Sequence, residues 1–257
     1  MRVVDIKSQA LQAPESRRDE VETIFSERFM LWLRCLEQNG LILEGQANVR
    51  KRNGTFFCRV VAQGDDALSE QRFNYETRKA AAYLLEMSDG APEFIDMGRS
   101  LMPRGCACGG KSPYLILYPC AEWEGSPIRC GGCNGSFPLY LTKKYAMDCE
   151  FGDILNWRKT FRGYVAHFTS GADRRDKYES YQMLNNCVSA LSLLGRRLAG
   201  DAERGTGILT YYPLFQQDEI IPNACPQCGA NWRNPYPAAI RFSHACPACR
   251  ICMGALG

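Results

Sequence analysis

Two Cys-x-x-Cys pairs near the C-terminus place the strongest constraint on how this chain folds. Cys225 and Cys228 form the first pair and Cys246 and Cys249 form the second, with 17 residues between the pairs. Two such turns present four thiolates that converge on one ion, which is the tetrahedral set that structural zinc prefers. Because zinc supplies much of the folding free energy of such a hairpin, the sequence predicts a zinc ribbon over residues 220–254. The alternatives are disulfides or unrelated buried thiols.

A second group of cysteines lies near the middle of the chain, within residues 103–140. It consists of four cysteines on either side of the strand-like segment YLILY: Cys106, Cys108, Cys130 and Cys133. We predict a second zinc site here, although a Cys-x-Cys arm is less usual than Cys-x-x-Cys and Cys120 is a possible substitute ligand. Two structural zinc ions per chain are therefore expected. Because a four-thiolate site has no open coordination position, neither ion is expected to be catalytic.

Composition limits the classes of protein to which the chain can belong. It has 257 residues, 46% of them hydrophobic, which is enough for two modest domains. Its net charge is only +3, from 31 basic and 28 acidic residues, so overall charge gives little support for nucleic-acid binding. There is no apolar run of about 18 residues and no secretory leader, which predicts a soluble, cytoplasmic protein without a membrane partner. Eight of the 14 cysteines fall in metal-type groups, as expected in a reducing compartment.

The first 100 residues predict a small α+β domain. Hydrophobic periodicity and turn residues indicate a strand at 2–6, a helix at 18–39, a hairpin from 41–51 and 55–63, a second helix at 75–87 and a strand at 93–97. The hairpin turn is Asn53-Gly54, the preferred two-residue connection. This order predicts a small antiparallel sheet with helices on one face.

Residues 101–257 are predicted to form the zinc-binding region, with a helical segment at 148–205 between the two cysteine groups. One helix is expected at 148–167 and a longer one at 172–203, followed by a strand at 208–215. The apolar stripe of the longer helix is expected to pack on the rest of the fold, and a seam for a partner helix is the alternative.

The region from 103 to 252 resembles a bacterial family of unknown function whose members contain zinc ribbons. Nucleic-acid binding has been conjectured for this family. It is similar in style to the double-CXXCG-motif proteins. The matching motifs are SPIRCGGC, FPLY, DILNW, LNNCVSALSLLGRRL, TYYPLF, CPQCGANW and CPACR. The resemblance implies zinc binding and no known enzymatic activity.

The residues themselves also predict a protein without a catalytic site. The chain has only two histidines, His167 and His244, and no nucleophile elbow or protease signature accompanies either of them. His244 is expected to be structural, and the alternative is that it replaces a neighbouring cysteine as a zinc ligand. No small-molecule substrate is evident, so we expect a binding protein rather than an enzyme.

Aromatic and arginine side chains within the two cysteine regions are the candidate partner contacts. These residue types are frequent anchors of protein interfaces. The candidates are Trp123, Trp232, Arg233, Tyr236 and Arg241. They predict a protein partner, as in an adaptor, an inhibitor or a toxin-immunity protein. For Trp232 the alternative is that its ring covers the zinc hairpin.

Nucleic-acid binding is the second functional hypothesis. Here Trp232 and Tyr236 would stack on bases while arginines contact phosphates. The cations considered for that face are Arg233, Arg241, Arg250, Arg196, Arg197, Arg204, Arg158, Lys159 and Arg162. Acidic residues lie among them and the net charge is close to neutral, so a protein partner is favoured.

Overall fold

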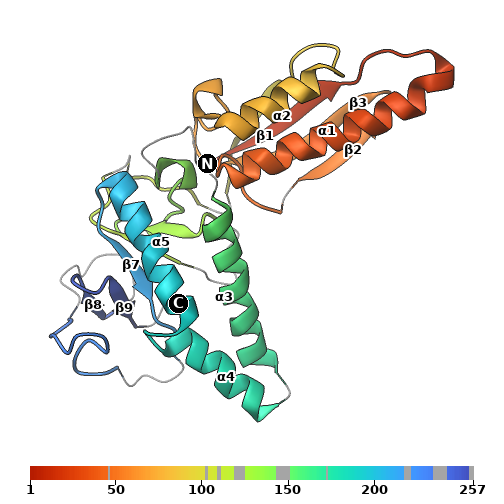
Figure 1. Ribbon diagram of the computed structural model, residues 1–257. Coiled ribbons are helices and arrows are strands. Elements are labelled where there is room, and N and C mark those ends of the chain that lie inside the picture. Colours follow the sequence, from red (N-terminus) through yellow and green to blue (C-terminus); the bar gives the residue numbers. More distant parts are fainter. Residues whose placement is uncertain are drawn as a thin grey trace. The chain divides into compact units, whose positions relative to one another are not determined.

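The chain folds into two compact units, each with its own sheet (Figure 1). The computed structural model describes residues 1–45, 47–101, 104–108, 111–118, 125–142, 151–171, 173–216, 221–233 and 242–254. The N-terminal unit comprises Met1–Gly105 with Tyr145–Phe151, and the C-terminal unit comprises Cys106–Lys144 with Gly152–Gly257. The predicted α+β class is confirmed.

The N-terminal unit is a four-stranded antiparallel sheet with two α-helices. Its elements are β1 (Arg2–Gln9), α1 (Arg18–Gln38), β2 (Asn48–Arg52), β3 (Thr55–Ala62), α2 (Tyr75–Leu85) and β4 (Glu93–Arg99), with short 3₁₀ turns at Glu15–Arg17 and Glu70–Arg72. The strand order is β2-β3-β1-β4. Asn53 and Gly54 have φ of 52° and 72°, as the predicted hairpin turn requires. The predicted strand, helix, hairpin, helix and strand are all present.

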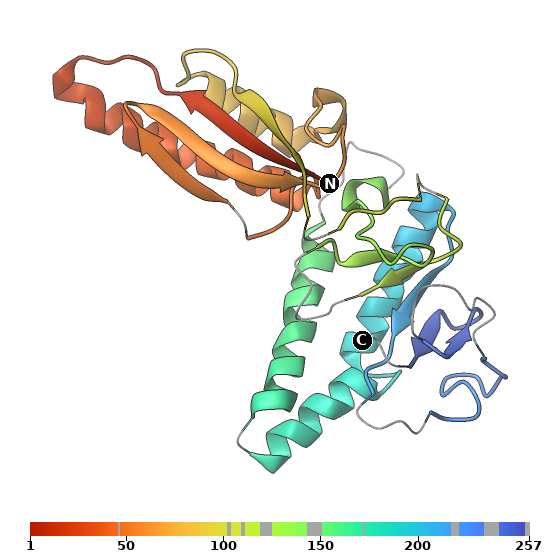
Figure 2. The same cartoon turned by 180° about the vertical axis from the view of Figure 1, so that it is seen from behind.

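The helices cover one face of this sheet and leave the other face without a helix (Figure 2). Along β1, Val4 and Ile6 are buried toward the helices, while Val3, Asp5 and Lys7, which alternate with them, are only partly buried. The apolar stripe of α1, which includes Trp32, is also buried. Burial of one stripe and one strand face against each other gives this unit its core.

The C-terminal unit contains a five-stranded mixed sheet and three α-helices. Its elements are β5 (Leu115–Leu117), β6 (Ile128–Cys130), a 3₁₀ turn at Leu139–Thr142, α3 (Gly152–Ser170), α4 (Arg174–Asn185), α5 (Ala190–Thr206), β7 (Thr210–Pro213), β8 (His244–Cys246) and β9 (Ile251–Met253). The order is β6-β5-β7-β9-β8. The β5–β6 and β8–β9 pairs are antiparallel, and β7 joins them by parallel pairing with β5 and β9. One sheet therefore carries both cysteine regions.

The single helix predicted at 172–203 is wrong, because the segment forms two helices. The side chain of Asn186 accepts a hydrogen bond from the Val188 amide at 3.0 Å, and Ser189 caps α5 by accepting from the Ser192 amide at 3.1 Å. Asn186 satisfies a backbone donor between the two helices, and Ser189 satisfies one in the first turn of α5, so α4 ends and α5 begins here. Val188 lies in this break and is 58% exposed, although the apolar stripe predicted for the single helix runs through its position.

Helix α5 packs closely on β7 through a glycine. A Cβ at Gly195 would lie 2.3 Å from the ring of Tyr212, so only glycine permits this approach. On the same helix, the Leu191 carbonyl accepts a hydrogen bond from the buried indole of Trp157 at 3.2 Å. The packing fixes α5 against the central strand of the sheet that carries the cysteines.

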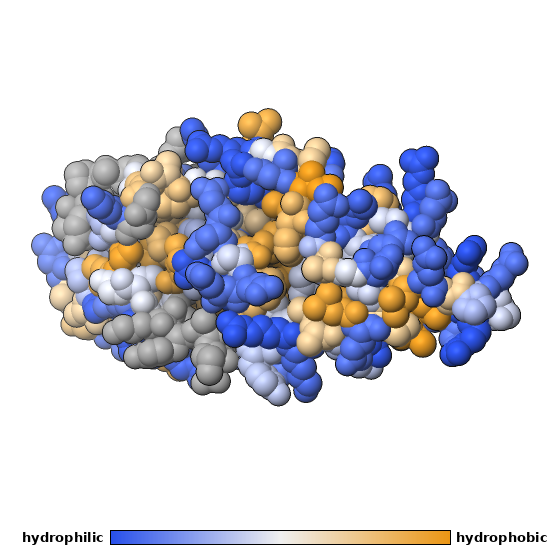
Figure 3. All heavy atoms as spheres, turned by 90° about the horizontal axis from the view of Figure 1, so that it is seen from above, coloured by the Kyte–Doolittle hydropathy of each residue, from blue (hydrophilic) through white to orange (hydrophobic). Residues whose placement is uncertain are grey.

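The surface has mixed character. On the side shown in Figure 3, hydrophilic residues lie among hydrophobic ones. Among the described residues, no helix is both long enough and apolar enough to cross a membrane.

Candidate metal centres

The C-terminal cysteines converge as the sequence predicted. The ligand atoms of Cys225, Cys228, Cys246 and Cys249 all lie within 4.8 Å of one another. Cys225 and Cys228 stand at the start and end of the first turn. Cys246 ends β8, and Cys249 lies in the turn between β8 and β9. The Sγ atoms of Cys228 and Cys246 are 3.7 Å apart.

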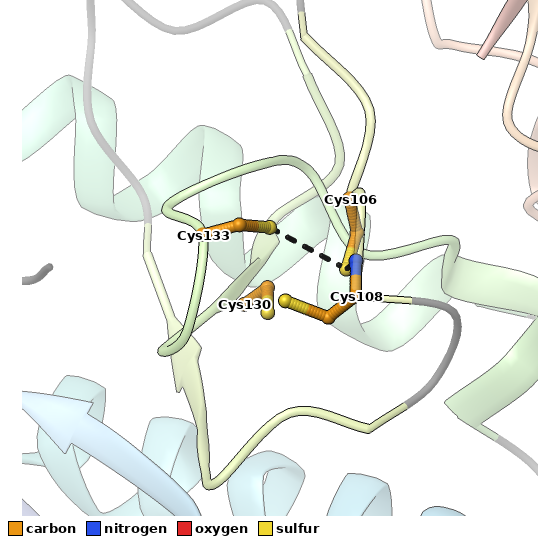
Figure 4. A group of neighbouring side chains, drawn as sticks. All are labelled: Cys106, Cys108, Cys130 and Cys133. Atoms are coloured by element: carbon orange, nitrogen blue, oxygen red, sulfur yellow. Dashed lines mark hydrogen bonds between the residues drawn. The ribbon is translucent and has the colours of Figure 1, made fainter. Parts of the chain in front are cut away.

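The mid-chain cysteines form a second cluster of the same kind. Figure 4 shows the side chains of Cys106, Cys108, Cys130 and Cys133 directed toward one another. The Sγ atoms of Cys106 and Cys133 are 3.7 Å apart. The Cys-x-Cys arm is therefore placed to supply two ligands, and the expected four residues form this cluster.

The three Cys-x-x-Cys turns share one backbone geometry. In each turn the residue after the second cysteine has a positive φ: 58° at Asn134, 72° at Gly229 and 59° at Arg250. Its amide donates to the carbonyl of the first cysteine, at 2.9 Å, 2.8 Å and 2.9 Å respectively. This left-handed position suits glycine and asparagine but is uncommon for arginine, so Arg250 must be held there by other contacts.

The mid-chain cluster leaves no space for side chains at the two adjacent glycines, Gly131 and Gly132. A Cβ at Gly131 would lie 2.3 Å from the Tyr114 ring, and one at Gly132 would lie 3.2 Å from the Cys108 sulfur. Amide groups also point at the sulfurs, since Ala107 donates to Cys133 Sγ at 3.3 Å. Such N–H···S bonds stabilise negative charge on the ligands.

Both clusters fit a tetrahedral metal ion. With a zinc–sulfur bond of about 2.3 Å, the sulfurs of a regular tetrahedron lie about 3.8 Å apart. The Cys106–Cys133 and Cys228–Cys246 sulfur separations, both 3.7 Å, match that edge. All twelve described cysteines are free thiols, so the disulfide alternative is not realised among them. Eight of those thiols can hold two metal ions.

Four thiols this close cannot all ionise without a cation. A hydrogen bond from the Cys106 thiol lowers the pKa of Cys130 to about 4, and the same bond is the main reason that the pKa of Cys106 is raised. Hydrogen bonds with Cys133 and Cys130 raise the pKa of Cys108 to about 11. A divalent ion removes this conflict, because it binds every sulfur as a thiolate.

The C-terminal cluster has one exposed member. Cys228 is exposed, and hydrogen bonding from the Ala230 amide, followed by bonds with Cys249 and Cys246, lowers its pKa to about 7. Burial raises the pKa of Cys246 and of Cys249. Cys228 is therefore the most reactive sulfur of this cluster when no ion is bound.

Helix α5 binds both turns of the C-terminal cluster, which the sequence did not indicate. Arg196 donates to the Cys249 carbonyl at 3.2 Å and to the Gln227 side chain at 3.1 Å. Glu203 accepts two hydrogen bonds from Arg250, at 2.6 Å and 2.7 Å. We call these contacts the α5 latch. They hold Arg250 in its left-handed conformation and fix the second turn beside the first.

Trp232 is buried, so its prediction as a surface contact is wrong. The side chain is 1% exposed, its indole N–H donates to the Pro222 carbonyl at 2.9 Å, and its ring lies 5.6 Å from the His244 ring. Its size and apolar character explain this position, which is the alternative considered from the sequence: it covers the metal hairpin. Arg233 is exposed. Trp123, Tyr236, Arg241 and the substitute ligand Cys120 lie outside the described residues.

His244 does not belong to the described metal clusters. It lies in β8, where its Nδ1 is 2.7 Å from the Ser243 hydroxyl, and neither ring nitrogen is a member of a cluster.

Most of the described arginines proposed for phosphate contact already have partners. Arg250 pairs with Glu203, Arg204 with Asp201, and Arg197 with Asp153 at 3.6 Å. Arg158 is buried and donates to the Gly125 carbonyl at 2.7 Å. These groups are committed to the fold, which weakens the case for nucleic-acid binding by this unit.

Comparison with known proteins finds a match between part of the chain and a domain family without a known function. The model of a domain of unknown function, DUF2310, matches residues 109–215, a region that ends before the C-terminal cysteines. An uncharacterized protein of Haemophilus influenzae is 26% identical over 201 residues, which cover 76% of each chain. Another from the same organism is 29% identical over 143 residues, covering 54% of this chain and 69% of the relative.

Solved structures resemble the chain only weakly. A protein from Nitrosomonas europaea described as a candidate antibiotic biosynthesis monooxygenase has a TM-score of 0.29 and 6% identity, covering 38% of this chain and 98% of that one. Another antibiotic biosynthesis monooxygenase has a TM-score of 0.29 and 13% identity, covering 39% and 99%.

Proposed function

We propose that this is a non-catalytic protein in which two zinc ions fix a surface that binds another protein. The single observation that carries the proposal is the convergence of eight cysteine sulfurs into two sets of four, with the ligand atoms of each set within 4.8 Å of one another. An all-sulfur donor set favours zinc over the hard cations, which prefer oxygen. Four protein ligands per ion leave no position for a substrate or for an activated water, so the ions act as structural cross-links.

The tips of the two C-terminal turns form the proposed docking surface. Pro226, Gln227 and Asn231 are exposed around the first turn, and Pro247 and Ala248 around the second. These tips are uncharged and rigidly held, because each turn is tied both to the ion and to α5. A preorganised, uncharged surface loses little conformational entropy on binding and suits a protein better than a polyanion.

Site-directed photo-crosslinking tests the proposal in cells of the native host. A benzoyl-phenylalanine at Ala248 should capture a defined polypeptide, and the matched substitution at Tyr178, exposed on α4, should not. The captured protein is then purified and titrated against the zinc-loaded chain.

Three results decide the outcome. Saturable binding that is lost on Ala248→Asp and kept on Tyr178→Asp supports the docking surface. Equal capture at both positions, or crosslinks to nucleic acid alone, contradicts it. Elemental analysis of the same preparation should give two zinc ions per chain, and a chain without zinc removes the basis of the proposal.

A further inference from the structure

The C-terminal cluster differs from the mid-chain cluster in the exposure of its cysteines. Cys228 is exposed, whereas Cys225, Cys246 and Cys249 are buried. In the mid-chain cluster one cysteine is buried and the other three are half-buried, so none of its four sulfurs belongs to an exposed residue. A small reagent in solution therefore has easier access to one sulfur of the C-terminal cluster than to any sulfur of the mid-chain cluster.

A second sulfur lies beside the exposed one. The Sγ atoms of Cys228 and Cys246 are 3.7 Å apart, and the two residues belong to different turns of the cluster. A disulfide bond is about 2.0 Å long, so the two sulfurs need to approach each other by only about 1.7 Å to form one. An accessible thiolate with a second thiolate beside it is the arrangement that makes a cysteine sensitive to oxidants.

Contacts that do not involve a metal ion keep the two turns side by side. Within the α5 latch, Arg196 donates to the Gln227 side chain at 3.1 Å and to the Cys249 carbonyl at 3.2 Å, which are groups on different turns. These hydrogen bonds do not depend on the ion, so the latch should hold both turns in place after the ion has left. The sulfur of Cys246 then stays within reach of Cys228.

We propose that Cys228 is a modification site for hydrogen peroxide and that its oxidation opens the C-terminal metal site. The Cys228 thiolate attacks one peroxide oxygen, and the O–O bond breaks. The sulfur is thereby oxidised by two electrons to a sulfenic acid, while the second oxygen leaves as hydroxide. The Cys246 thiolate then attacks the sulfenic sulfur, so that an S–S bond forms, the S–O bond breaks and a second hydroxide leaves. Two protons from solvent convert the two hydroxides to water.

The disulfide removes half of the ligands of the C-terminal site. Only Cys225 and Cys249 remain as thiolates there, whereas structural zinc sites have four ligands, so the ion should dissociate. The two turn tips that carry Gln227 and Ala248 then lose their metal cross-link, and the proposed docking surface loses its fixed shape. This inference rests on the proposed function, because it requires zinc at the C-terminal site and a partner that docks on these tips.

Stepwise addition of hydrogen peroxide to the full-length, zinc-loaded protein tests the proposal, with a fluorescent zinc indicator as the readout. One of the two zinc ions per chain should be released before the other begins to leave. Peptide mapping by mass spectrometry should then find Cys228 linked to Cys246, with all four mid-chain cysteines unoxidised. Dithiothreitol followed by zinc should restore two ions per chain.

Two neighbouring arginines of α5 supply matched variants. Arg196→Gln removes a contact with both turns, whereas Arg197→Gln removes the same charge from a side chain that pairs with Asp153 at 3.6 Å. Without the latch contact the second sulfur is held less firmly beside the first, so peroxide should carry a larger fraction of Cys228 on to sulfinic acid in Arg196→Gln. Arg197→Gln should give the same ratio of disulfide to sulfinic acid as the wild type.

Several outcomes would overturn the proposal. These are simultaneous release of both ions, earlier oxidation of the mid-chain cysteines, a disulfide within one turn, or sulfinic acid on Cys228 without a disulfide. Equal sulfinic acid in the two arginine variants would contradict the role of the latch.

The crosslinking experiment at Ala248 tests the consequence for docking. Capture of the partner should be lost after peroxide and should return after reduction with zinc, and capture by the disulfide form would contradict a switch. A reduced protein without zinc would remove the proposed function and this inference together. A protein that holds two zinc ions and releases neither in peroxide would contradict this inference alone, so the two failures are distinguishable.

Discussion

Replacing Glu203 by Gln should loosen zinc at the C-terminal site without touching a ligand. Glutamine keeps the shape of the side chain, but its neutral amide cannot accept both hydrogen bonds that Arg250 now donates. Arg250 follows the ligand Cys249, and its carbonyl accepts from the Tyr212 amide at 2.7 Å. The substitution therefore frees the second turn from α5 and removes the contact that holds Arg250 at a φ of 59°.

The size of the effect follows from the geometry of the pair. A hydrogen bond to a charged group contributes about 1.5–3 kcal/mol when it is fully protected from solvent. The side chains of Arg250 and Glu203 are 35% and 25% exposed, so screening reduces the value for the pair to about 1–3 kcal/mol. Loss of a group that orients a metal ligand typically lowers metal affinity by about 10–100-fold.

The effect should be constant near neutral pH. The hydrogen bond from Arg250 lowers the pKa of Glu203, so the carboxylate is charged well below neutrality. A group with a lowered folded pKa stabilises the fold above its unfolded pKa, and that contribution is lost as the pH falls through the folded value. The difference between the wild type and Glu203→Gln should thus be the same at about pH 6 and about pH 8.

Competition with the chromogenic chelator pyridylazoresorcinol measures the change. In Glu203→Gln, one of the two zinc ions per chain should transfer to the chelator at a chelator concentration about 10–100-fold lower than in the wild type. The release of the other zinc ion should not change. Glu179→Gln is the matched control, because Glu179 pairs with Arg175 at 2.9 Å on the exposed side of α4, away from both metal sites. Identical release curves for the two variants would refute the role of the latch.

Three further predictions concern packing, ligand assignment and thiol reactivity. Gly195→Ala should lower the free energy of unfolding by about 1–3 kcal/mol, because the new Cβ would lie 2.3 Å from the Tyr212 ring. Gly200→Ala in the same helix should raise the free energy of unfolding by about 0.5–1 kcal/mol, because its Cβ meets only the end of the Arg204 side chain, at 3.6 Å. Urea titration measures both, and equal effects would contradict the packing of α5. The variants Cys133→Ser and Cys228→Ser should each contain one zinc ion fewer than the wild type, as measured by atomic emission. A variant that still contains two zinc ions would show that the replaced cysteine is not a ligand. In metal-stripped protein, iodoacetamide should label Cys228 before the other cysteines of its cluster. The labelling rate should fall about tenfold for each pH unit below the Cys228 pKa of about 7. A labelling rate that does not change with pH in that range would contradict this prediction.

Local signals were sufficient to predict the N-terminal unit. The helix over 18–39 and the Asn53-Gly54 hairpin depend on spacing and on turn residues that lie within a few positions of one another. Spacing also predicted which eight cysteines form the two clusters that could hold metal, because the members of each pair are close together in the sequence. The break at Asn186 and Ser189 was missed, because the hydrophobic period continues through it and the caps are ordinary polar residues.

Contacts between distant residues have no such signature. Nothing in the sequence indicates that β7 pairs in parallel with both β5 and β9, so the two cysteine regions were expected as separate modules. Glu203 lies 47 residues from Arg250, and no periodic pattern connects them. The burial of Trp232 was not predicted, because tryptophan is frequent both in interfaces and in cores, and only contacts with distant residues decide between the two.

Zinc-edge X-ray absorption of the full chain, purified without added metal, tests the central claim most directly. From the two cysteine clusters we predict two zinc ions per chain, each surrounded by four sulfur atoms at about 2.3 Å. An absorption edge without zinc, or a first shell that contains nitrogen or oxygen, would contradict the assignment of two closed cysteine sites.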